Sequence, residues 1–544
     1  MFIEKKALSD KITKFLTSLK TNKTILLLLT IIFIGAFLRL HDFNNLLRFN
    51  ADQIRDAQII DTMAAGDNFP FFGPKAGGTK FNLGGGFYYL QYLSGSIFGF
   101  SPNGIALFIP ILSTISIYLF YLLFKRIFSI NITLGLTFLY AISFYAIKYS
   151  HFAWNPNVIP FFLLAFLLLL ARISHPKNNL LDFALLGLVI GVASQLHTTL
   201  LILMPIATLI ILIWTFTTKT ERIKFSFSKI FLLIFIFILA NLPFIYGNFL
   251  DHGKNIQEFF AGSSSKAASG SSLVKNITAD ITFFLQGSAY YLTGIEPQKN
   301  WGNIIKLIKS KNLTEIVLFI SSLLLFLAGG YSLFIEKIKS NRNKIARNSS
   351  LILLTFSILA FLFFIFIGNE LNIRFFIILS FLPYLLLGAL LESIYKKINS
   401  PNLKAIIFAA LAILLILFNL NIFSKTYNLD NYTAPESAYG GISLGELNEM
   451  CSKIDSALKS NPGSIQTAFV DSFEFKRSLG YICLKKSIVI KELPKEQSQD
   501  ITLFFAIVEN ANAKKNIEKY SINFKLEDSQ KIKRFTLLTF SAIK

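Results

Sequence analysis

The sequence has few cysteines and few charged residues. Its 544 residues include two cysteines, and Asp, Glu, Lys and Arg together make up 15% of the chain. Two cysteines exclude a cysteine-rich metal site and a disulfide-scaffold protein. Because 53% of the residues are apolar, with Phe at 58 positions, the remaining polar residues cannot cover the surface of a water-soluble fold. The composition therefore indicates an integral membrane protein and excludes disordered and collagen-like chains.

The long apolar runs contain almost no charge. We count eleven runs of membrane-spanning length, at 24–40, 103–124, 131–147, 158–173, 180–195, 198–217, 230–249, 313–336, 350–368, 373–394 and 405–423. Arg39, Lys125, Glu336 and Glu392 fall at run ends, where side chains can reach the membrane interface. Ion-coupled transporters usually carry carboxylates or broken helices at mid-membrane depth. The runs show neither feature, which counts against transport.

Basic residues concentrate in alternate loops. The net charge is +22, but in a membrane protein Lys and Arg first mark cytoplasmic segments, so we expect no nucleic-acid partner. The basic segments are the tail 1–23 and 125–126, 172–177, 219–229, 337–347 and 396–404. The N-terminus is therefore predicted inside and, with eleven spans, the C-terminus outside.

Three large segments then face outward. They are the loops 41–102 and 250–311 and the tail 425–544, around a membrane region of residues 24–424. The tail shows strand-like runs at 465–472, 487–492, 501–508 and 535–540, with helical patterns between them. The predicted fold is an all-α polytopic membrane protein with a small C-terminal α/β domain outside the membrane. Cys451 and Cys483 both lie in this domain, either as a disulfide bond or as two unpaired buried cysteines.

Acidic residues gather just after the first span. Asp52, Arg55 and Asp56 share one face of a helix at spacings of three and four residues. One interpretation is an amphipathic surface helix whose charges pair with one another. The other is a catalytic carboxylate beside a cation at a cleft.

Further candidates lie in the other outward segments. A glycine-rich stretch carries Lys80, which suits either a phosphate site or a flexible turn; His151, Trp154 and Asn155 precede a proline turn. Gln195 and His197 lie at a helix end, and Arg374 begins the tenth span. Each also has a structural interpretation: a membrane anchor for Trp154, a satisfied histidine at 197, and contact with lipid phosphate for Arg374.

These segments resemble the GT-C class of polytopic glycosyltransferases, within it the protein O-mannosyltransferase and aminoarabinose-transferase-like superfamily. The resemblance covers about residues 30–395. It is carried by Asn50-Ala51-Asp52-Gln53-Ile54-Arg55-Asp56, Gly85-Gly86-Phe87-Tyr88-Tyr89, Trp154-Asn155-Pro156-Asn157, Gln195-Leu196-His197 and Arg374-Phe375-Phe376 with Pro383. Such families typically place an Asp-Glu pair in the first outer loop, whereas this chain has Asp52-Gln53. Asp56 is the candidate for the second acid.

The resemblance implies an inverting transfer of a sugar from a polyprenyl-phosphate donor to an unknown acceptor on the outer face of a plasma membrane. Asp52 would act as the general base. Arg55, Lys80 and Arg374, in this order, would hold the donor phosphate, while His151, Trp154, Asn155, Gln195 and His197 would line the sugar or acceptor pocket. No cofactor is expected, although some members of the wider class use a divalent metal.

Three alternatives stay open at this stage. An envelope polysaccharide ligase or polymerase would depend on outer-loop arginines and a histidine instead of an acid. A transporter or lipid flippase would need polar groups within the membrane. A non-catalytic scaffold would depend on residues 425–544 and would tolerate Asp52→Asn.

Overall fold

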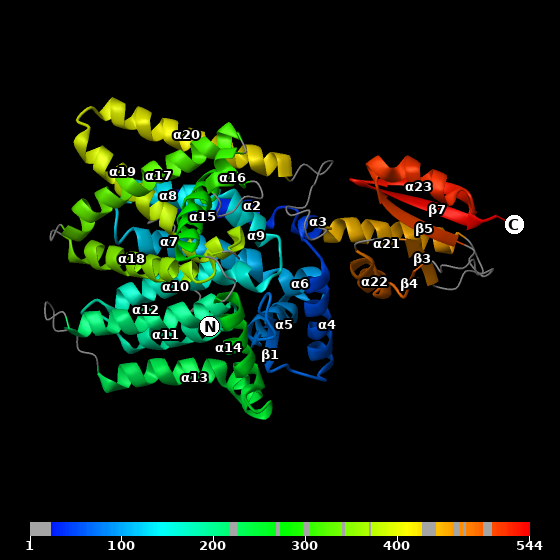
Figure 1. Cartoon of the computed structure of the whole chain (residues 1–544), viewed down its shortest axis with the longest axis horizontal. Helices are drawn as coiled ribbons and strands as arrows, with labels where there is room; N and C mark the ends of the chain where they lie inside the picture. The colour runs from blue at the N-terminus through cyan, green and yellow to red at the C-terminus, as the bar shows by residue number, and fades with distance from the viewer. Residues whose placement is uncertain are drawn as a thin grey trace, which may run out of the picture.

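The computed structural model describes residues 23–217, 226–267, 272–297, 304–309, 311–339, 343–368, 371–426, 442–460, 467–471, 475–492 and 503–543. In these ranges the chain forms a bundle of long helices with a separate sheet domain at one end of the bundle (Figure 1). The predicted basic tail lies outside the described residues, apart from Lys23.

Eight of the described helices are long and apolar enough to cross a membrane. They are α2 (Lys23–Leu40), α6–α7 (Pro102–Ala106 and Phe108–Phe124), η1–α10 (Asn155–Val158 and Ile159–Ile173), α12 (Thr198–Thr217), α13 (Phe227–Leu250), α17–η2 (Leu313–Leu333 and Phe334–Lys339), α18 (Lys344–Ile365) and α20 (Pro401–Thr426). All eight coincide with predicted spans, which confirms a multi-pass helical membrane protein.

The other three predicted spans are interrupted or short. α8 (Ile130–Ala141) and α9 (Phe144–Ser150) are bent by 46°, and η4 (Ile373–Leu379) and α19 (Leu382–Lys397) by 54°. α11 (Leu180–Ala193) has 14 residues and lies beside α10, α12 and α13 (Figure 1). Against about eleven predicted spans, the described residues contain eight, or ten if each bent pair is one span.

Buried polar side chains hold the break between α8 and α9. Arg39 Nη1 donates to the Ala141 carbonyl at 2.6 Å, and the Phe144 N–H donates to Asn419 Oδ1 at 2.8 Å. These bonds satisfy backbone groups that a helix break would otherwise leave unpaired in an apolar environment. Arg39 is completely buried, so the expectation that it reaches the membrane interface is wrong. In the second pair Pro383, which follows the break, cannot donate a helical hydrogen bond.

The segment 250–311 contains α14 (Lys254–Ala267), α15 (Leu273–Thr293) and α16 (Ile304–Lys309). α15 packs against α17, α18 and α19 and carries the buried Asp280. The bundle interior therefore includes a carboxyl group and two broken helices, which the apolar runs do not reveal. The sequence-based argument against transport is correspondingly weaker.

The segment 41–102 gathers at the end of the bundle that faces the sheet domain (Figure 1). Its elements are α3 (Phe43–Leu46), α4 (Ala51–Ala65), β1 (Phe72–Lys75), β2 (Asn82–Gly84) and α5 (Gly86–Phe98), followed by α6. β1 and β2 form an antiparallel hairpin.

The predicted α/β domain is confirmed. It contains α21 (Leu444–Lys459), β3 (Thr467–Asp471), α22 (Lys476–Leu484), β4 (Val489–Lys491), β5 (Leu503–Glu509), η6 (Asn510–Asn512), α23 (Ala513–Tyr520), β6 (Phe524–Ile532) and β7 (Phe535–Ala542). The sheet order is β4-β3-β5-β7-β6, with β4, β3 and β5 parallel and the rest antiparallel. Of the two interpretations of the cysteines, the structure has the disulfide bond, which joins α21 to α22.

Candidate active site

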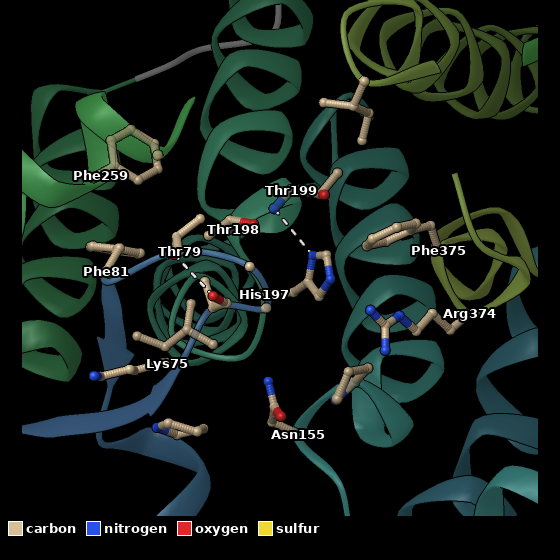
Figure 2. A pocket seen from close by; sticks show the side chains of 18 of the residues that line it. Lys75, Thr79, Phe81, Asn155, His197, Thr198, Thr199, Phe259, Arg374 and Phe375 are labelled. Carbon is tan, nitrogen blue, oxygen red and sulfur yellow. Dashed lines mark hydrogen bonds between the residues drawn. The ribbon is translucent and has the colours of Figure 1, made fainter. Parts of the chain in front are cut away.

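A cavity of about 670 Å³ lies where α4 and the β1–β2 hairpin meet the membrane helices. Its walls come from α4, the β1–β2 hairpin, the turn before η1, the start of α12, α14, the end of α18, and η4. Figure 2 shows Lys75 and Arg374 on opposite sides of this space, with the His197 ring between them and Asn155 below. The lining includes Asp52, Arg55, Lys75, Gly77, Thr79, Trp154, Asn155, His197, Phe363, Phe366, Arg374 and Phe375.

The charged helix α4 begins and ends at residues suited to those positions. Asn50 precedes it in an extended conformation, and its N–H donates to Gln53 Oε1 at 3.0 Å. Gly66 follows it at φ 83°, a left-handed conformation that glycine adopts without steric cost. The helix therefore starts one residue before Asp52, which places this carboxylate in the first turn.

Arg55 joins the two carboxylates of α4. Its Nη1 lies 3.0 Å from Asp52 Oδ1, and its Nη2 lies 2.7 Å from Asp56 Oδ1. The Asp52 side chain is 51% exposed and lines the cavity, whereas the Asp56 side chain is 1% exposed and does not. Both sequence interpretations of this helix thus hold in part, because its charges pair with one another and one carboxylate also faces a cavity.

The burial of Asp56 changes its titration. Burial raises the pKa of Asp56 to about 7, against the opposing effect of Arg55. The charge of Asp52 raises the pKa further, and a hydrogen bond from Tyr88 lowers it. Asp56 can therefore change charge near neutral pH while Arg55 still touches Asp52.

Gln53 is turned away from the cavity. It is 2% exposed, and its Nε2 donates to the Ala153 carbonyl at 2.9 Å while its Oε1 accepts from Asn50. The side chain at this position therefore donates one hydrogen bond and accepts another. An amide can do both, whereas an ionised carboxylate can only accept. Gln53 ties the start of α4 to the residue before Trp154.

Six of the ten predicted site residues line the cavity: Asp52, Arg55, Trp154, Asn155, His197 and Arg374. Asn155 also donates from Nδ2 to the Leu196 carbonyl at 2.6 Å, and His197 Nδ1 accepts from the Thr199 N–H at 3.2 Å (Figure 2). These two bonds fix the directions of both side chains within the wall.

The other four predicted residues lie outside the lining. Asp56 is buried behind Arg55, and Lys80 is exposed beyond the hairpin turn. His151 is buried, its Nδ1 lies 3.1 Å from the Ile147 carbonyl, and burial lowers its pKa to about 4. Gln195 Oε1 accepts from the Gly86 N–H at 3.0 Å and so holds the backbone after β2. His151 and Gln195 are thus supporting residues, because their polar atoms face the protein.

Lys75 is the lining cation that the sequence interpretation missed. It is the last residue of β1, whereas Lys80 lies five residues further on. The turn between them contains Gly78 at φ 73°, where other residues are strained. Lys75 pairs with Asn82 in the hairpin, and this register, which the sequence does not reveal, accompanies its position in the cavity wall.

Arg374 has an aromatic setting instead of an acidic one. Its guanidinium lies 5.3 Å from the Trp154 ring centroid and 5.5 Å from that of Phe375. Across the part of the chain that the structure describes, no carboxylate forms an ion pair with Arg374. Stacking on an aromatic ring orients an arginine without neutralising it, so Arg374 presents a positive charge to the cavity.

The described side chains offer few ligands for a divalent metal. Within the described ranges no three His, Cys, Asp or Glu residues come together as metal ligands. The nearest oxygen ligands, on Asp52 and Asp56, are both bonded to Arg55. A hard cation prefers at least six oxygen ligands.

The comparisons with known proteins point to one enzyme class. Residues 86–246 match the family model described as dolichyl-phosphate-mannose-protein mannosyltransferase. This segment runs from α5 to α13 and includes Trp154, Asn155 and His197. No curated protein sequence matches the chain.

Several solved structures are similar to all or part of the chain. ArnT from Cupriavidus metallidurans, bound to undecaprenyl phosphate, is 11% identical, with 95% of this chain and 97% of that chain covered and a TM-score of 0.49. The archaeal oligosaccharyltransferase AglB from Archaeoglobus fulgidus, in complex with an inhibitory peptide and a dolichol-phosphate, is 14% identical, with 90% and 70% covered and a TM-score of 0.46. The S. cerevisiae protein O-mannosyltransferase complex bound to the sugar donor is 16% identical, with 43% and 34% covered and a TM-score of 0.33.

The resemblance seen in the sequence is thus confirmed by an independent family match that includes part of the cavity wall. Over residues 86–246 the chain is therefore similar to a family of membrane glycosyltransferases, in agreement with the resemblance to the GT-C class.

Proposed function

We propose that this enzyme transfers one sugar from a polyprenyl-phosphate carrier to an acceptor hydroxyl, with inversion at the anomeric carbon and Asp52 as general base. The reaction takes place in the 670 Å³ cavity, on the outer face of the membrane. The observation that carries the proposal is that a carboxylate and a guanidinium without an acidic partner among the described residues line the same cavity. Asp52 presents a carboxylate from α4, and Arg374 presents a guanidinium with no acidic partner in the described chain.

The cations of the cavity suit a lipid phosphate. Arg374 and Lys75 both line it, from opposite sides in Figure 2. Charge-assisted hydrogen bonds from such groups bind phosphate oxygens and stabilise the charge that develops as the phosphate leaves. Arg55 is less suited, because Asp52 and Asp56 already neutralise it.

The apolar wall suits the carrier chain. Phe363, Phe366 and Ile367 line the cavity from the end of the spanning helix α18, next to Phe375 of η4. A polyprenyl chain that follows this wall would place its phosphate beside Arg374. Lipid and phosphate would thus be bound by adjoining parts of one cavity.

The chemical step follows from these positions. The acceptor oxygen forms a bond to the anomeric carbon as the bond from that carbon to the phosphate oxygen breaks, and the polyprenyl phosphate leaves with the bonding electrons. The acceptor proton passes to Asp52. Since the phosphate is already anionic, no general acid is needed, and a positioned base contributes about 10²–10⁴-fold.

Asp52 suits the role of base better than Asp56 does. Its side chain is half exposed and lines the cavity, whereas Asp56 is buried beneath Arg55. Arg55 holds Asp52 by a single 3.0 Å bond to Oδ1. In this arrangement Asp56 orients Arg55, and Arg55 orients the base.

The test is a transfer assay with purified protein in lipid nanodiscs and a panel of radiolabelled polyprenyl-phosphate sugars. We expect Asp52→Asn to lower kcat by about 100-fold or more while donor binding is retained. Asp67→Asn is the matched control, because Asp67 lies just beyond α4, is exposed and does not line the cavity.

Two results would contradict the proposal. Unchanged turnover in Asp52→Asn would exclude Asp52 as the base, and a large loss confined to Asp56→Asn would transfer the role to Asp56. A wild-type protein that binds none of the polyprenyl-phosphate donors would exclude the donor class itself.

One observation favours a second candidate, the envelope polysaccharide ligase or polymerase. This activity would depend on an arginine and a histidine, and Arg374 and His197 both line the cavity. Loss of transfer in Arg374→Ala and His197→Ala, with full activity in Asp52→Asn, would support the ligase.

A further inference from the structure

The residues just before α4 form a short ladder with two distant segments. The Arg48 N–H donates to the His151 carbonyl at 3.0 Å, so this strand lies beside the turn that leads to Trp154. On its other side the Phe49 N–H donates to the Ile442 carbonyl at 3.0 Å, and the Leu444 N–H donates to the Leu47 carbonyl at 2.8 Å. The first described residues of the sheet domain thus pair directly with the strand that enters α4.

The third segment of the ladder continues into α21. Ser443 pairs with Arg48 and is also the N-cap of α21, where its Oγ accepts from the Glu446 N–H at 3.2 Å. Gly445 lies close to Asn45 of α3, and a Cβ there would come within 2.9 Å of the Asn45 backbone. Little space is therefore left for α21 to move relative to α3.

The disulfide and α22 connect α21 to the later part of α4. Cys451 of α21 is bonded to Cys483 of α22, and both are completely buried. On α22 the Tyr481 hydroxyl donates to Asp61 Oδ2 at 2.9 Å, and Lys485 Nζ lies 2.8 Å from the same oxygen. Asp61 lies on α4 nine residues after Asp52, which is about 13 Å along the helix.

We propose that the sheet domain is a positioning element of the active site, and that Asp61 and Tyr481 are positioning residues for Asp52. The connections form a closed circuit from the start of α4 through the ladder, α21, the disulfide and α22 to the later part of α4. The ladder also includes the turn that carries Trp154. The domain therefore sets the position of the carboxylate of α4 relative to the opposite cavity wall.

In this arrangement residues 425–544 hold Asp52 in position, which a domain attached only by a flexible linker could not do. A displacement of about 1 Å in a catalytic group can reduce the rate by about 100-fold. Opening the circuit should therefore lower kcat, while binding of the donor lipid, whose site lies on α18 and η4, changes little. The kinetic part of this inference rests on the proposed function; the mechanical part does not.

The experiment combines hydrogen–deuterium exchange with donor kinetics on the full chain in nanodiscs. The variants are Tyr481→Phe, Asp61→Lys, the charge exchange Asp61→Lys/Lys485→Asp, and Cys451→Ala/Cys483→Ala. We expect faster exchange over residues 47–65 and a kcat lower by at least about 10-fold in Asp61→Lys and in the cysteine variant, with the donor dissociation constant within about twofold. The charge exchange Asp61→Lys/Lys485→Asp should restore the wild-type exchange rate over residues 47–65 and the wild-type kcat.

Glu492→Gln is the matched control. Glu492 pairs with Lys476, also on α22, at 2.6 Å, and this ion pair does not involve α4. Wild-type exchange over 47–65 in Asp61→Lys and in the cysteine variant would overturn the proposal, and so would equal effects of Glu492→Gln. If no donor supports transfer by the wild-type protein, the proposed function fails, and the exchange measurement still decides the inference.

Discussion

Introducing a carboxylate at position 53, directly after the proposed base Asp52, should harm this protein. In Gln53→Glu the side chain keeps its shape, but an ionised carboxylate would face the Ala153 carbonyl, to which Gln53 Nε2 now donates at 2.9 Å. With 2% exposure, water cannot relieve this contact. The carboxyl group can replace both amide bonds only when it is protonated, since it then donates one hydrogen bond and accepts the other.

The size of the effect follows from the cost of protonation. An exposed glutamate titrates near 4.3, so holding the group neutral costs about 3.7 kcal/mol at pH 7 and about 1 kcal/mol at pH 5. Because burial raises its pKa in the folded state, the variant loses stability relative to wild type as pH rises through this range. Gln53→Leu loses the same two bonds and should show a deficit that does not depend on pH.

The assay is thermal unfolding of both variants and wild type in the same detergent at pH 5 and pH 7. We expect the deficit of Gln53→Glu to grow between the two pH values by an amount equivalent to about 2–3 kcal/mol, and its transfer activity at pH 7 to fall with it. A Gln53→Glu protein as stable as wild type at pH 7 would refute the role assigned to Gln53. An equal deficit at both pH values would refute the protonation argument.

The remaining predictions concern Arg374, Asp56 and Arg39. Arg374→Lys keeps the charge but loses the planar contact with Trp154, so kcat/KM should fall by about 10-fold. In Arg374→Ala, which also loses the charge, kcat/KM should fall by about 10²–10³-fold. Equal kcat/KM in wild type and Arg374→Lys would show that charge alone suffices. Since burial raises the pKa of Asp56 to about 7, its ion pair with Arg55 is complete above that pH and is lost as pH falls through it. The acidic limb of the plot of kcat against pH should therefore lie near pH 7 and should move in Asp56→Asn. A limb that does not move would contradict this assignment. Arg39→Met leaves the Ala141 carbonyl without its donor and should cost about 1–3 kcal/mol, measurable as a lower unfolding temperature, whereas an unchanged temperature would show that the helix break needs no cap.

The membrane region follows closely from composition and hydropathy. All eleven predicted spans are helical in the structure, because a chain in lipid must satisfy its backbone hydrogen bonds internally. The break between α8 and α9 was not predicted, since it depends on Arg39 and Asn419, which approach residues 142–143 from α2 and α20. In the sheet domain the edge strand β6 was missed because Lys525, Glu527, Asp528 and Lys531 interrupt any apolar alternation, and its pairing comes from β7.

The sequence alone determined the class of molecule, the helical membrane region, the C-terminal α/β domain and the acidic segment beside the first span. These features depend on local composition and spacing. Which side chains share a cavity was decided only by the tertiary structure, because contacts between distant segments set it. Lys75 replaces Lys80 as a lining cation through the hairpin, and Arg55 and Arg374 differ in partners although the sequence treats both as candidate cations. The proposed role of the sheet domain likewise depends on backbone pairing between residues 47–49 and 442–444. These segments are about 400 positions apart, so local sequence patterns cannot predict their contact.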